Sequence, residues 1–403
     1  MPASSSGPSF RFASALAARP GIRQAVLDVC GRAASELGDR PDLALLFLSS
    51  DSAGVAGEMA ELVCQRLDTE CLVGCTAESL VGRSYEIEGQ TAASLWIARL
   101  PGVRVEPIHL IFETTPDGAT ILGWPDSLLE GWPNEATLLL MADPFSFPIE
   151  MLLEEANQRH PDSTLIGGMS SGGVLPGDNR LLFGPRTFDH GAVAVMLSGP
   201  LRVRTIVSQG CRPIGEPLVI TRAERNMVQE LGGRPAFEQL DTLFGNLPTC
   251  EQNLVNRGLH LGRVVDEYRE RFEQGDFLVR NVVGFDPDAG VIVVSDYMRV
   301  GQTVQFQVRD AQTADAELRQ MLASAARRIA PPAAALTFTC NGRGTRLFGQ
   351  PHHDASALSQ VWGDIPMAGF FAAGEIGPVG GVNFLHGFTA SIALFEPQLE
   401  FTL

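Results

Sequence analysis

Cysteine, arginine, glutamate and histidine side chains near the C-terminal end are the residues of this sequence best suited to chemistry. Cys340 follows an apolar run and stands just before the turn Gly342-Arg343-Gly344. The neighbouring arginine could lower the pKa of the thiol and so produce a nucleophilic or redox-sensitive cysteine. Glu375 and His386 are the residues that could complete a catalytic triad with it.

Each of these residues also has a plain structural explanation. A cysteine on an apolar strand is usually a small buried hydrophobic residue, and nothing in the sequence sets its distance from His386. We therefore predict no catalytic residue and no enzyme, with a thiol-dependent enzyme or redox sensor using Cys340 as the alternative. Arg343 is the best candidate for a ligand anchor, because a guanidinium group pairs with a carboxylate through two hydrogen bonds. Its structural alternative is an internal salt bridge, for which Glu375 is a candidate partner.

Metal ligands and cofactor motifs are not indicated. The run His352-His353-Asp354 places adjacent histidines in different directions on a helix or a strand, so a helix start with Asp354 near the N-cap is the better interpretation. Cys71 and Cys75 share a strand face, but no second pair or suitably spaced histidine follows. No segment matches the GxGxxG or GxxxxGK[ST] phosphate motifs. We predict no metal and no cofactor.

The elements that must position these residues occur three times along the chain. Each copy has an apolar strand with a polar end, a helix, a second buried strand that ends in small residues, a hairpin-like loop and a third strand after a glycine. The first strands cover 44–51, 137–143 and 336–341, the helices 55–67, 149–159 and 353–362, the second strands 72–79, 165–172 and 367–374, and the third strands 91–98, 192–197 and 388–394. This pattern predicts a mixed α/β (α+β) fold, with mixed sheets flanked by helices in two fused halves.

The region between the second and third copies has a different pattern. We predict helices over 223–231, 236–244 and 313–329, and a meander of strands over 277–283, 290–296 and 303–308. The predicted domains are a helical lead-in over 1–40, an N-terminal domain over 41–240 and a C-terminal domain over 241–396.

Strand ends in repeated units tend to gather at one edge of a sheet, where open α/β sheets bind ligands. We therefore expect the glycines and hydroxyl groups there to form a pocket for a small polar molecule. The alternative is that the glycines only satisfy turns or close packing. The candidate ligand-binding residues are Gly74, Cys75, Thr76, Ser170, Ser171, Gly172, Cys340, Asn341, Gly342, Arg343, Gly344, Gly374, Glu375, Gly377 and His386.

The composition excludes several classes of partner. The chain has 30 basic and 47 acidic residues, a net charge of −17, and no run of lysine or arginine, which argues against nucleic acid and anionic membranes. Its seven cysteines form no CxxC pair, which favours a reducing compartment. No signal peptide and no apolar run of the ~18 residues needed for a membrane helix is recognisable. We predict a cytoplasmic protein.

Three C-terminal segments resemble the C-terminal half of the FIST family: Cys340-Asn-Gly-Arg-Gly344, Gly369-Phe-Phe-Ala-Ala-Gly-Glu-Ile-Gly377 and His386-Gly-Phe-Thr-Ala-Ser-Ile-Ala-Leu394. Residues 212–220 and 233–236 resemble the stretch that joins the halves of that family, and Gly74-Cys-Thr-Ala77 resembles its N-terminal half. The similarity covers nearly everything after about residue 40.

The resemblance implies a sensory input domain for small ligands such as amino acids. Family members occur alone, fused to signalling modules or next to an F-box, and neither module is recognisable here. A separate signalling protein is therefore expected as partner, and a homodimer is possible. For an amino-acid ligand, Arg343 and Glu375 would bind the carboxylate and the ammonium group. The remaining alternative is a protein-interaction scaffold without a ligand.

Overall fold

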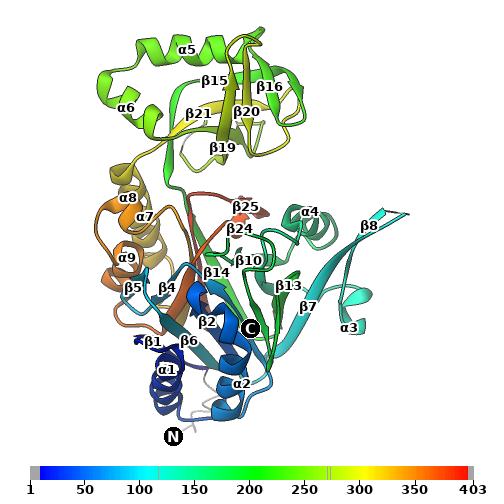
Figure 1. Cartoon of the computed structure of the whole chain (residues 1–403), viewed down its shortest axis with the longest axis vertical. Coiled ribbons are helices and arrows are strands. Elements are labelled where there is room, and N and C mark those ends of the chain that lie inside the picture. Colours follow the sequence, from blue (N-terminus) through cyan, green and yellow to red (C-terminus); the bar gives the residue numbers. More distant parts are fainter. Residues whose placement is uncertain (1–9, 117, 270, 273, 398–403) are drawn as a thin grey trace, which may run out of the picture. The chain divides into compact units, whose positions relative to one another are not determined.

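The computed structural model describes residues 10–116, 118–269, 271–272 and 274–397. The chain divides into two compact units (Figure 1). Unit 1 contains the described residues up to Val207, residues 319–385 and the described residues from Thr389 onward, while unit 2 contains residues 208–318 and 386–388. Unit 1 therefore draws on both of the predicted domains, 41–240 and 241–396.

Three mixed sheets form unit 1, and each is built around the same three strands and one helix. Two parallel strands are joined by the helix, and a third strand pairs antiparallel with the first of them. The three sets are β2 (Leu43–Ser49), α2 (Ala56–Leu67), β3 (Leu72–Ala77) and β6 (Ala92–Arg99); β9 (Thr137–Ala142), α4 (Ile149–Arg159), β10 (Thr164–Met169) and β13 (Ala192–Ser198); and β22 (Ala334–Cys340), α9 (His353–Trp362), β23 (Met367–Ala372) and β26 (Ala390–Pro397). The predicted fold of repeated strand-helix-strand-loop-strand units is confirmed.

Each sheet is completed by a hairpin that follows the second strand of a different set. The hairpins are β4 (Ser79–Gly82) with β5 (Tyr85–Glu88), which joins β23; β11 (Leu181–Phe183) with β12 (Arg186–Phe188), which joins β3; and β24 (Glu375–Val379) with β25 (Val382–His386), which joins β10. The three sets are thus linked in a cycle, and every second strand leads directly into a neighbouring sheet.

An additional strand covers the other edge of each three-strand set. These strands are β1 (Arg11–Ala18) beside β6, β7 (Arg104–Thr115) beside β13 and β14 (Leu201–Ser208) beside β26, and β8 (Gly118–Leu122) extends the second sheet. A helical lead-in was expected over residues 1–40, but in the described residues 10–40 strand β1 precedes helix α1 (Ile22–Leu37). The strand conformation is favoured because β1 pairs along its whole length with β6, whose backbone groups would otherwise lie unpaired at the sheet edge.

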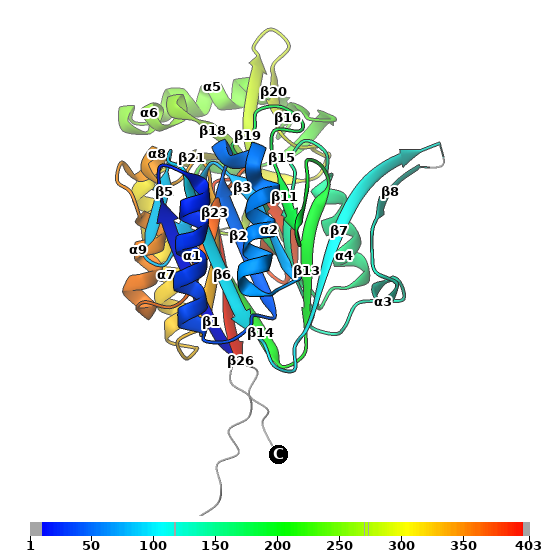
Figure 2. The ribbon, with the colours of Figure 1, turned by 60° about the horizontal axis from the view of Figure 1, so that its bottom comes forward.

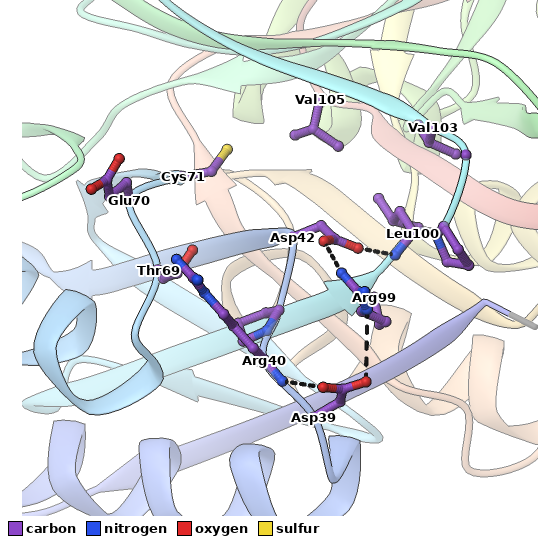
Figure 3. A pocket seen from close by; sticks show the side chains of 13 residues that line it. Asp39, Arg40, Asp42, Thr69, Glu70, Cys71, Arg99, Leu100, Val103 and Val105 are labelled. Atoms are coloured by element: carbon purple, nitrogen blue, oxygen red, sulfur yellow. Dashed lines mark hydrogen bonds and ion pairs between the residues drawn. The ribbon is translucent and has the colours of Figure 1, made fainter. Parts of the chain in front are cut away.

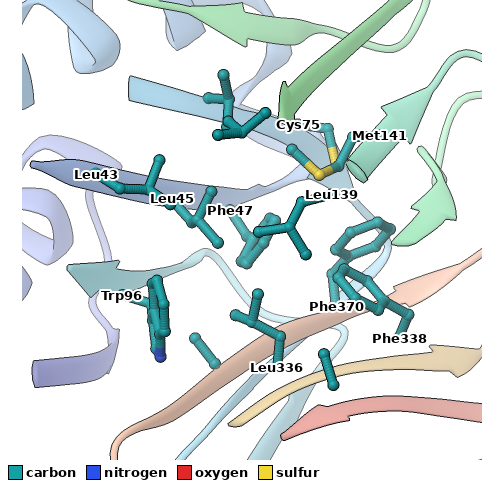
Figure 4. Close-up of a cluster of buried hydrophobic side chains, with 14 of the residues drawn as sticks. Leu43, Leu45, Phe47, Cys75, Trp96, Leu139, Met141, Leu336, Phe338 and Phe370 are labelled. Carbon is teal, nitrogen blue, oxygen red and sulfur yellow. The ribbon is translucent and has the colours of Figure 1, made fainter. Parts of the chain in front are cut away.

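The inner faces of the three sheets share one hydrophobic core. Phe47 comes from the first sheet, Leu139 from the second, and Phe338 and Phe370 from the third (Figure 4). Helices α1 and α2 pack on the outer face of the first sheet (Figure 2), and α3 (Asp126–Leu129) and α4 pack on the second. Because both faces of each sheet are covered, the strands are continuous apolar runs without alternation. A 3₁₀ helix, η1 (Ser50–Val55), leads into α2, and α8 (Thr345–Phe348) precedes α9.

One glycine occupies the same position in all three second strands. Gly74, Gly167 and Gly369 each face a residue of the first strand of their set, in a register that places any added Cβ 1.8 Å from that residue's carbonyl oxygen. No side chain fits at that separation. Gly74, a candidate ligand-binding residue, is therefore explained by the close approach of two strands.

Replacing Gly74 by alanine is expected to lower the free energy of unfolding by about 2 to 3 kcal/mol, because β2 and β3 must move apart. Urea denaturation measures this loss. Gly31→Ala is the matched control, since a Cβ at this helical position meets nothing within 4 Å, and it is expected to be neutral or slightly stabilising. Equal stabilities of the two variants would contradict the close approach.

Unit 2 contains one seven-stranded sheet, in the order β15-β21-β18-β19-β20-β16-β17. Its elements are β15 (Cys211–Glu224), β16 (Met227–Leu231), β17 (Arg234–Pro235), α5 (Ala236–Asn246), α6 (Thr249–Arg257), β18 (Leu259–Val264), β19 (Phe277–Asp286), β20 (Val291–Val294), β21 (Thr303–Arg309) and the start of α7 (Ala311–Ala326). Side chains of α5 and α6 contribute to a core with Leu261 and Phe306 on one face of the sheet.

The predicted strands over 277–283, 290–296 and 303–308 and the predicted helices over 236–244 and 313–329 are confirmed as β19 to β21, α5 and α7. The predicted meander is wrong, because β21 pairs with β15 and β18 and not with β20. The helix predicted over 223–231 is wrong, because this segment forms a β-hairpin between the end of β15 and β16. Arg225 takes the left-handed conformation at the turn, with φ of 55°. Val228 and Leu231 are fully buried against the sheet, and burial in a specific pairing outweighs the helical spacing of the apolar residues.

Candidate functional site

The ends of the three second strands meet within unit 1. Ser170 at the end of β10 donates a hydrogen bond of 2.7 Å from its hydroxyl to the carbonyl oxygen of Thr76 on β3. The hydroxyl of Ser171 donates to the carbonyl of Phe371 on β23 and accepts from the backbone amide of Glu78 at 2.9 Å. The predicted convergence of the strand ends is therefore present in the structure.

The polar groups at this junction form hydrogen bonds with one another and with neighbouring backbone. Thr76, Ser170 and Ser171 are at most 2% exposed, and their hydroxyl or carbonyl groups bond to one another or to neighbouring backbone. The backbone amide of Met169 also donates to the carbonyl of Gly374 at 2.8 Å. Hydroxyl groups that hold three strands together in this way are not directed at a ligand, so these residues form a structural junction.

Cys75 and Gly172 also have structural explanations. Cys75 lies in the shared core, and burial raises the pKa of its thiol far above the usual value. Gly172 adopts a left-handed turn with φ of 88°, and a Cβ there would lie 2.4 Å from the Cβ of Ser50. Close packing accounts for both residues.

Arg343 forms a buried salt bridge, and its partner is Asp354 rather than Glu375. The guanidinium Nε donates to Oδ2 of Asp354 at 2.7 Å and Nη2 donates to Oδ1 at 2.8 Å, while the Phe348 ring lies 5.2 Å from the guanidinium carbon. Asp354 was expected near the N-cap of its helix, but His352 is the N-cap residue, and Asp354 lies within the first turn of α9. The sequence does not show that this turn packs over the loop after β22.

The electrostatics of this pair extend to a hairpin from another part of the chain. Burial alone would raise the pKa of Asp354, but the charge and hydrogen bonds of Arg343 more than reverse that effect and hold it well below its usual range. Glu86 on β5 accepts the Ala355 amide at 2.9 Å, and burial together with the negative charge of Asp354 raises the pKa of Glu86 to about 7. Sequence reasoning missed Glu86, because the alternation along Tyr85–Glu88 does not reveal which glutamate points inward.

A second group of buried polar atoms, which we name the Cys340 site, comprises Cys340, Asn341, Glu375 and Thr389. Glu375 at the start of β24 is fully buried, and its Oε2 accepts from the amide of Thr389 at 3.1 Å and from the Thr389 hydroxyl at 2.9 Å. Burial raises the pKa of Glu375 to about 8, and hydrogen bonds from Thr389 and the Cys340 thiol with the charge of Arg343 only partly offset it. Glu375 therefore holds a proton at neutral pH.

Two acceptor oxygens of the Cys340 site lack ordinary donors. Apart from the Cys340 thiol, no donor in the described part of the chain bonds to Oε1 of Glu375, and none bonds to the buried Oδ1 of Asn341. Cys340 is partly exposed at the end of β22, and its sulfur accepts the Gly342 amide at 3.5 Å. The site thus combines a partly exposed cysteine with two buried oxygen atoms that lack an ordinary hydrogen-bond donor in the described part of the chain.

The remaining predicted ligand-binding residues include Gly344, Gly377 and His386. A Cβ on Gly344 would lie 2.7 Å from the Phe371 ring, and one on Gly377 would lie 2.4 Å from the Ser391 hydroxyl, so both glycines serve packing. His386 ends β25, is buried and belongs to unit 2. The Cys340 site is consequently described without a histidine.

A pocket of about 920 Å³ lies in unit 1 at the opposite ends of strands β2 and β3 from the strand-end junction (Figure 3). It is lined at the starts of β2 and β3 and the end of β6 by Asp39, Asp42, Cys71 and Arg99, among others. Arg99 pairs with Asp42 and lies 3.7 Å from Asp39, and burial raises the pKa of Cys71 to about 12. Both Asp42 and Asp39 face Arg99, so these charged groups are engaged with one another, and none of the predicted ligand-binding residues lines the pocket.

Across the described residues, no helix combines the length and the apolar character that crossing a membrane requires.

Comparison with known proteins agrees with the fold and the motifs. The FIST N domain model matches residues 42–234, and the FIST C domain model matches residues 236–378. A Mycobacterium bovis protein named Uncharacterized protein Mb0898c is 44% identical over 383 residues, which cover 94% of this chain and 97% of that protein. Uncharacterized protein Rv0628c of Mycobacterium tuberculosis is 43% identical over 387 residues, 96% of this chain and 99% of that protein. FIST domains are associated with sensory roles in signal transduction. The chain belongs to the FIST family, with a FIST N domain followed by a FIST C domain.

Proposed function

We propose that this chain is a small-ligand-binding sensory protein and that the Cys340 site receives the ammonium group of an amino acid or a related amine. The observation that carries the proposal is the pair of buried acceptors, Oε1 of Glu375 and Oδ1 of Asn341, which no ordinary donor satisfies in the described chain. Buried polar atoms are nearly always hydrogen-bonded, so such exceptions call for an explanation. A bound ammonium group can donate to both oxygens once the proton of Glu375 has been released.

The raised pKa of Glu375 couples the binding of a cation to the loss of the carboxyl proton. Without a ligand the carboxyl group is mostly neutral at pH 7, because its pKa lies at about 8. An incoming ammonium stabilises the ionised carboxylate and so lowers that pKa. Binding therefore releases a proton near neutral pH, and affinity rises with pH until Glu375 is ionised in the free protein.

Arg343 is no longer the natural anchor for the carboxylate of the ligand. Its Nε and Nη2 both bond to Asp354, and the pair is at most 1% exposed. We propose that Arg343 and Asp354 position the turn 340–344 and that the ligand is recognised through its amino group.

The proposal also covers the signalling partner, the cellular location and the oligomeric state of the protein. Ligand occupancy would be read by a separate signalling protein, since a sensor acts by shifting between states that a partner distinguishes. A cytoplasmic location is proposed from the seven cysteines without CxxC pairs, and a homodimer is proposed on the general frequency of two-fold assemblies.

The test compares amino acids with their N-acetylated forms, which keep the carboxylate and lose the ammonium group. We expect saturable increases of Tm with the free amino acid that fits, none with its acetylated form, and loss of the increase in Glu375→Gln. Glu78→Gln is the control, because Glu78 also follows a second strand but pairs with Arg346 at the surface. Equal responses to both forms of the ligand, or a full response in Glu375→Gln, would rule out this mode of binding.

A thiol-dependent activity is the second candidate, favoured by one observation. The partly exposed Cys340 lies beside Glu375, a carboxyl group with a pKa of about 8 that could accept the thiol proton in the fraction of molecules where it is ionised, a fraction that grows as the pH rises towards 8. Rapid alkylation of Cys340 that is slowed in Glu375→Gln would support it. Ligand binding that persists unchanged in Cys340→Ala would favour the sensor.

A further inference from the structure

One face of the unit 2 sheet carries buried polar side chains on two neighbouring strands, β18 and β21, beside the exposed Asn281 of β19. His260 on β18 lies opposite Gln307 on β21 and opposite Asn281 on β19. The other face of the same strands carries Leu261 and Phe306, which belong to the apolar core of unit 2. His260 is 4% exposed and Gln307 is 1% exposed, although neither residue is apolar.

Several polar atoms of these two side chains lack a well-formed hydrogen bond. Among the residues that the structure describes, no atom lies in hydrogen-bonding geometry to either ring nitrogen of His260 or to Nε2 of Gln307. The Asn281 side chain is the one group that acts on the ring as a hydrogen-bond partner, in the direction that raises the pKa of His260, and its effect is smaller than those of burial and of Arg309. Buried donors without acceptors are rare in folded proteins and commonly mark the position of a water, an ion or a ligand.

Two further residues of unit 2, Phe388 and Arg309, place an aromatic ring and a positive charge near His260. The Phe388 ring centre lies 4.3 Å from that of His260, and the guanidinium carbon of Arg309 lies 4.7 Å from the Phe388 ring centre. Phe388 has a φ of 66°, a left-handed conformation that bulky residues rarely adopt. Backbone strain of this kind is concentrated at ligand sites and switch regions.

We propose that His260, Gln307 and Arg309 form a second small-molecule site, within unit 2, for a small carboxylate. The Gln307 amide and one ring nitrogen of His260 supply hydrogen-bond donors, Arg309 supplies positive charge, and Phe388 supplies an apolar wall. Arg309 is the charged group that acts on His260, so the local field attracts an anion. All of its residues belong to unit 2, whereas those of the Cys340 site belong to unit 1, and it selects the opposite charge.

The protonation state of His260 fits this role. Burial, together with the positive charge of Arg309, lowers the pKa of His260 to about 4, so the ring is neutral at pH 7 and has one N–H donor. A carboxylate bound beside it offsets the field of Arg309 and partly compensates the ring for burial. Binding therefore raises the pKa of His260.

The experiment uses the intact protein with acetate, propionate and succinate, and with sodium chloride at matched ionic strength as the control. We expect a saturable rise of Tm with at least one carboxylate and an upward shift of the His260 pKa, read from its ring proton signals by NMR. Gln307→Leu should weaken the binding at least tenfold, and Gln307→Glu, which places a negative charge at the site, should abolish it. Glu78→Gln, at a surface ion pair with Arg346, should leave it unchanged.

Several outcomes would overturn the proposal. A response to chloride equal to that of the carboxylates would indicate nonspecific screening. The absence of any saturable response, with an unshifted His260 signal, would indicate that water alone occupies the position. Binding that survives in both Gln307 variants would place the carboxylate elsewhere. Because Gln307→Glu preserves the size of the side chain, the proposal stays testable if Gln307→Leu fails to fold.

Discussion

Replacing Arg343 by methionine is expected to lower the free energy of unfolding by about 3 to 5 kcal/mol, because it leaves Asp354 as a buried charge without its partner. The two side chains are 0% and 1% exposed and share two hydrogen bonds of 2.7 and 2.8 Å. Urea denaturation at pH 7 measures the loss. The accompanying prediction is that Asp354, which Arg343 keeps ionised, becomes protonated in the variant.

A double variant separates the loss of the pair from the loss of packing. Arg343→Met with Asp354→Leu removes both charges and is expected to recover most of the lost stability. Arg159→Met serves as the control, because its ion pair with Glu155 on α4 is largely exposed and is expected to contribute less than about 1 kcal/mol. If Arg343→Met were no more destabilising than this control, Arg343 would be available to bind a ligand.

The second large effect is on the pH dependence of stability. The pKa of Glu375 rises from 4.5 to about 8 on folding, so between these values the folded chain holds a proton that the unfolded chain has lost. Stability therefore falls as pH rises from about 4.5 to about 8, and the total contribution is about 5 kcal/mol at roughly 1.4 kcal/mol per unit. Glu375→Gln removes this contribution and should be more stable than the wild type above pH 8.

Unfolding curves at intervals from pH 5 to pH 9 test this expectation. Glu86 acts in the same direction, with its pKa raised to about 7, so Glu86→Gln should remove a separate part of the slope at lower pH. Glu78→Gln should keep the wild-type profile. If the free energy of unfolding changed with pH in the same way in Glu375→Gln and in the wild type, Glu375 would be ionised in the folded protein. That result would also contradict the proposed release of a proton on ligand binding.

Most elements of unit 1 were predictable because burial leaves a strong pattern in each of them. Strand β2 is a continuous apolar run that ends in serine, and α4 and α9 follow the predicted bounds to the residue. The errors lie where pairing partners decide the conformation. Residues 11–18 form a strand because β6 needs a neighbour, and residues 227–231 form a strand because they pair with β15 and β20.

The candidate site was predictable only in part. The sequence order places Cys340 and Glu375 at the ends of strands in the same set, and the structure brings them together. The partner of Arg343 was not predictable, since Asp354 was assigned a helix-capping role. His260 and Gln307 carried no recognisable motif, because their register on β18 and β21 emerges only from the sheet.

The sequence by itself determined the local pattern: which segments are buried, where helices join parallel strands, and which polar residues follow the strand ends. Apolar periodicity and glycine placement act over a few residues, so they can be read without a structure. Only the tertiary structure decided which polar groups satisfy one another. The exchange of hairpins among the three sheets brings Glu86 to α9, and the convergence of the strand ends satisfies the hydroxyls of Ser170 and Ser171. Hydrogen bonds depend on distances between atoms far apart in the chain, and no local pattern encodes those distances.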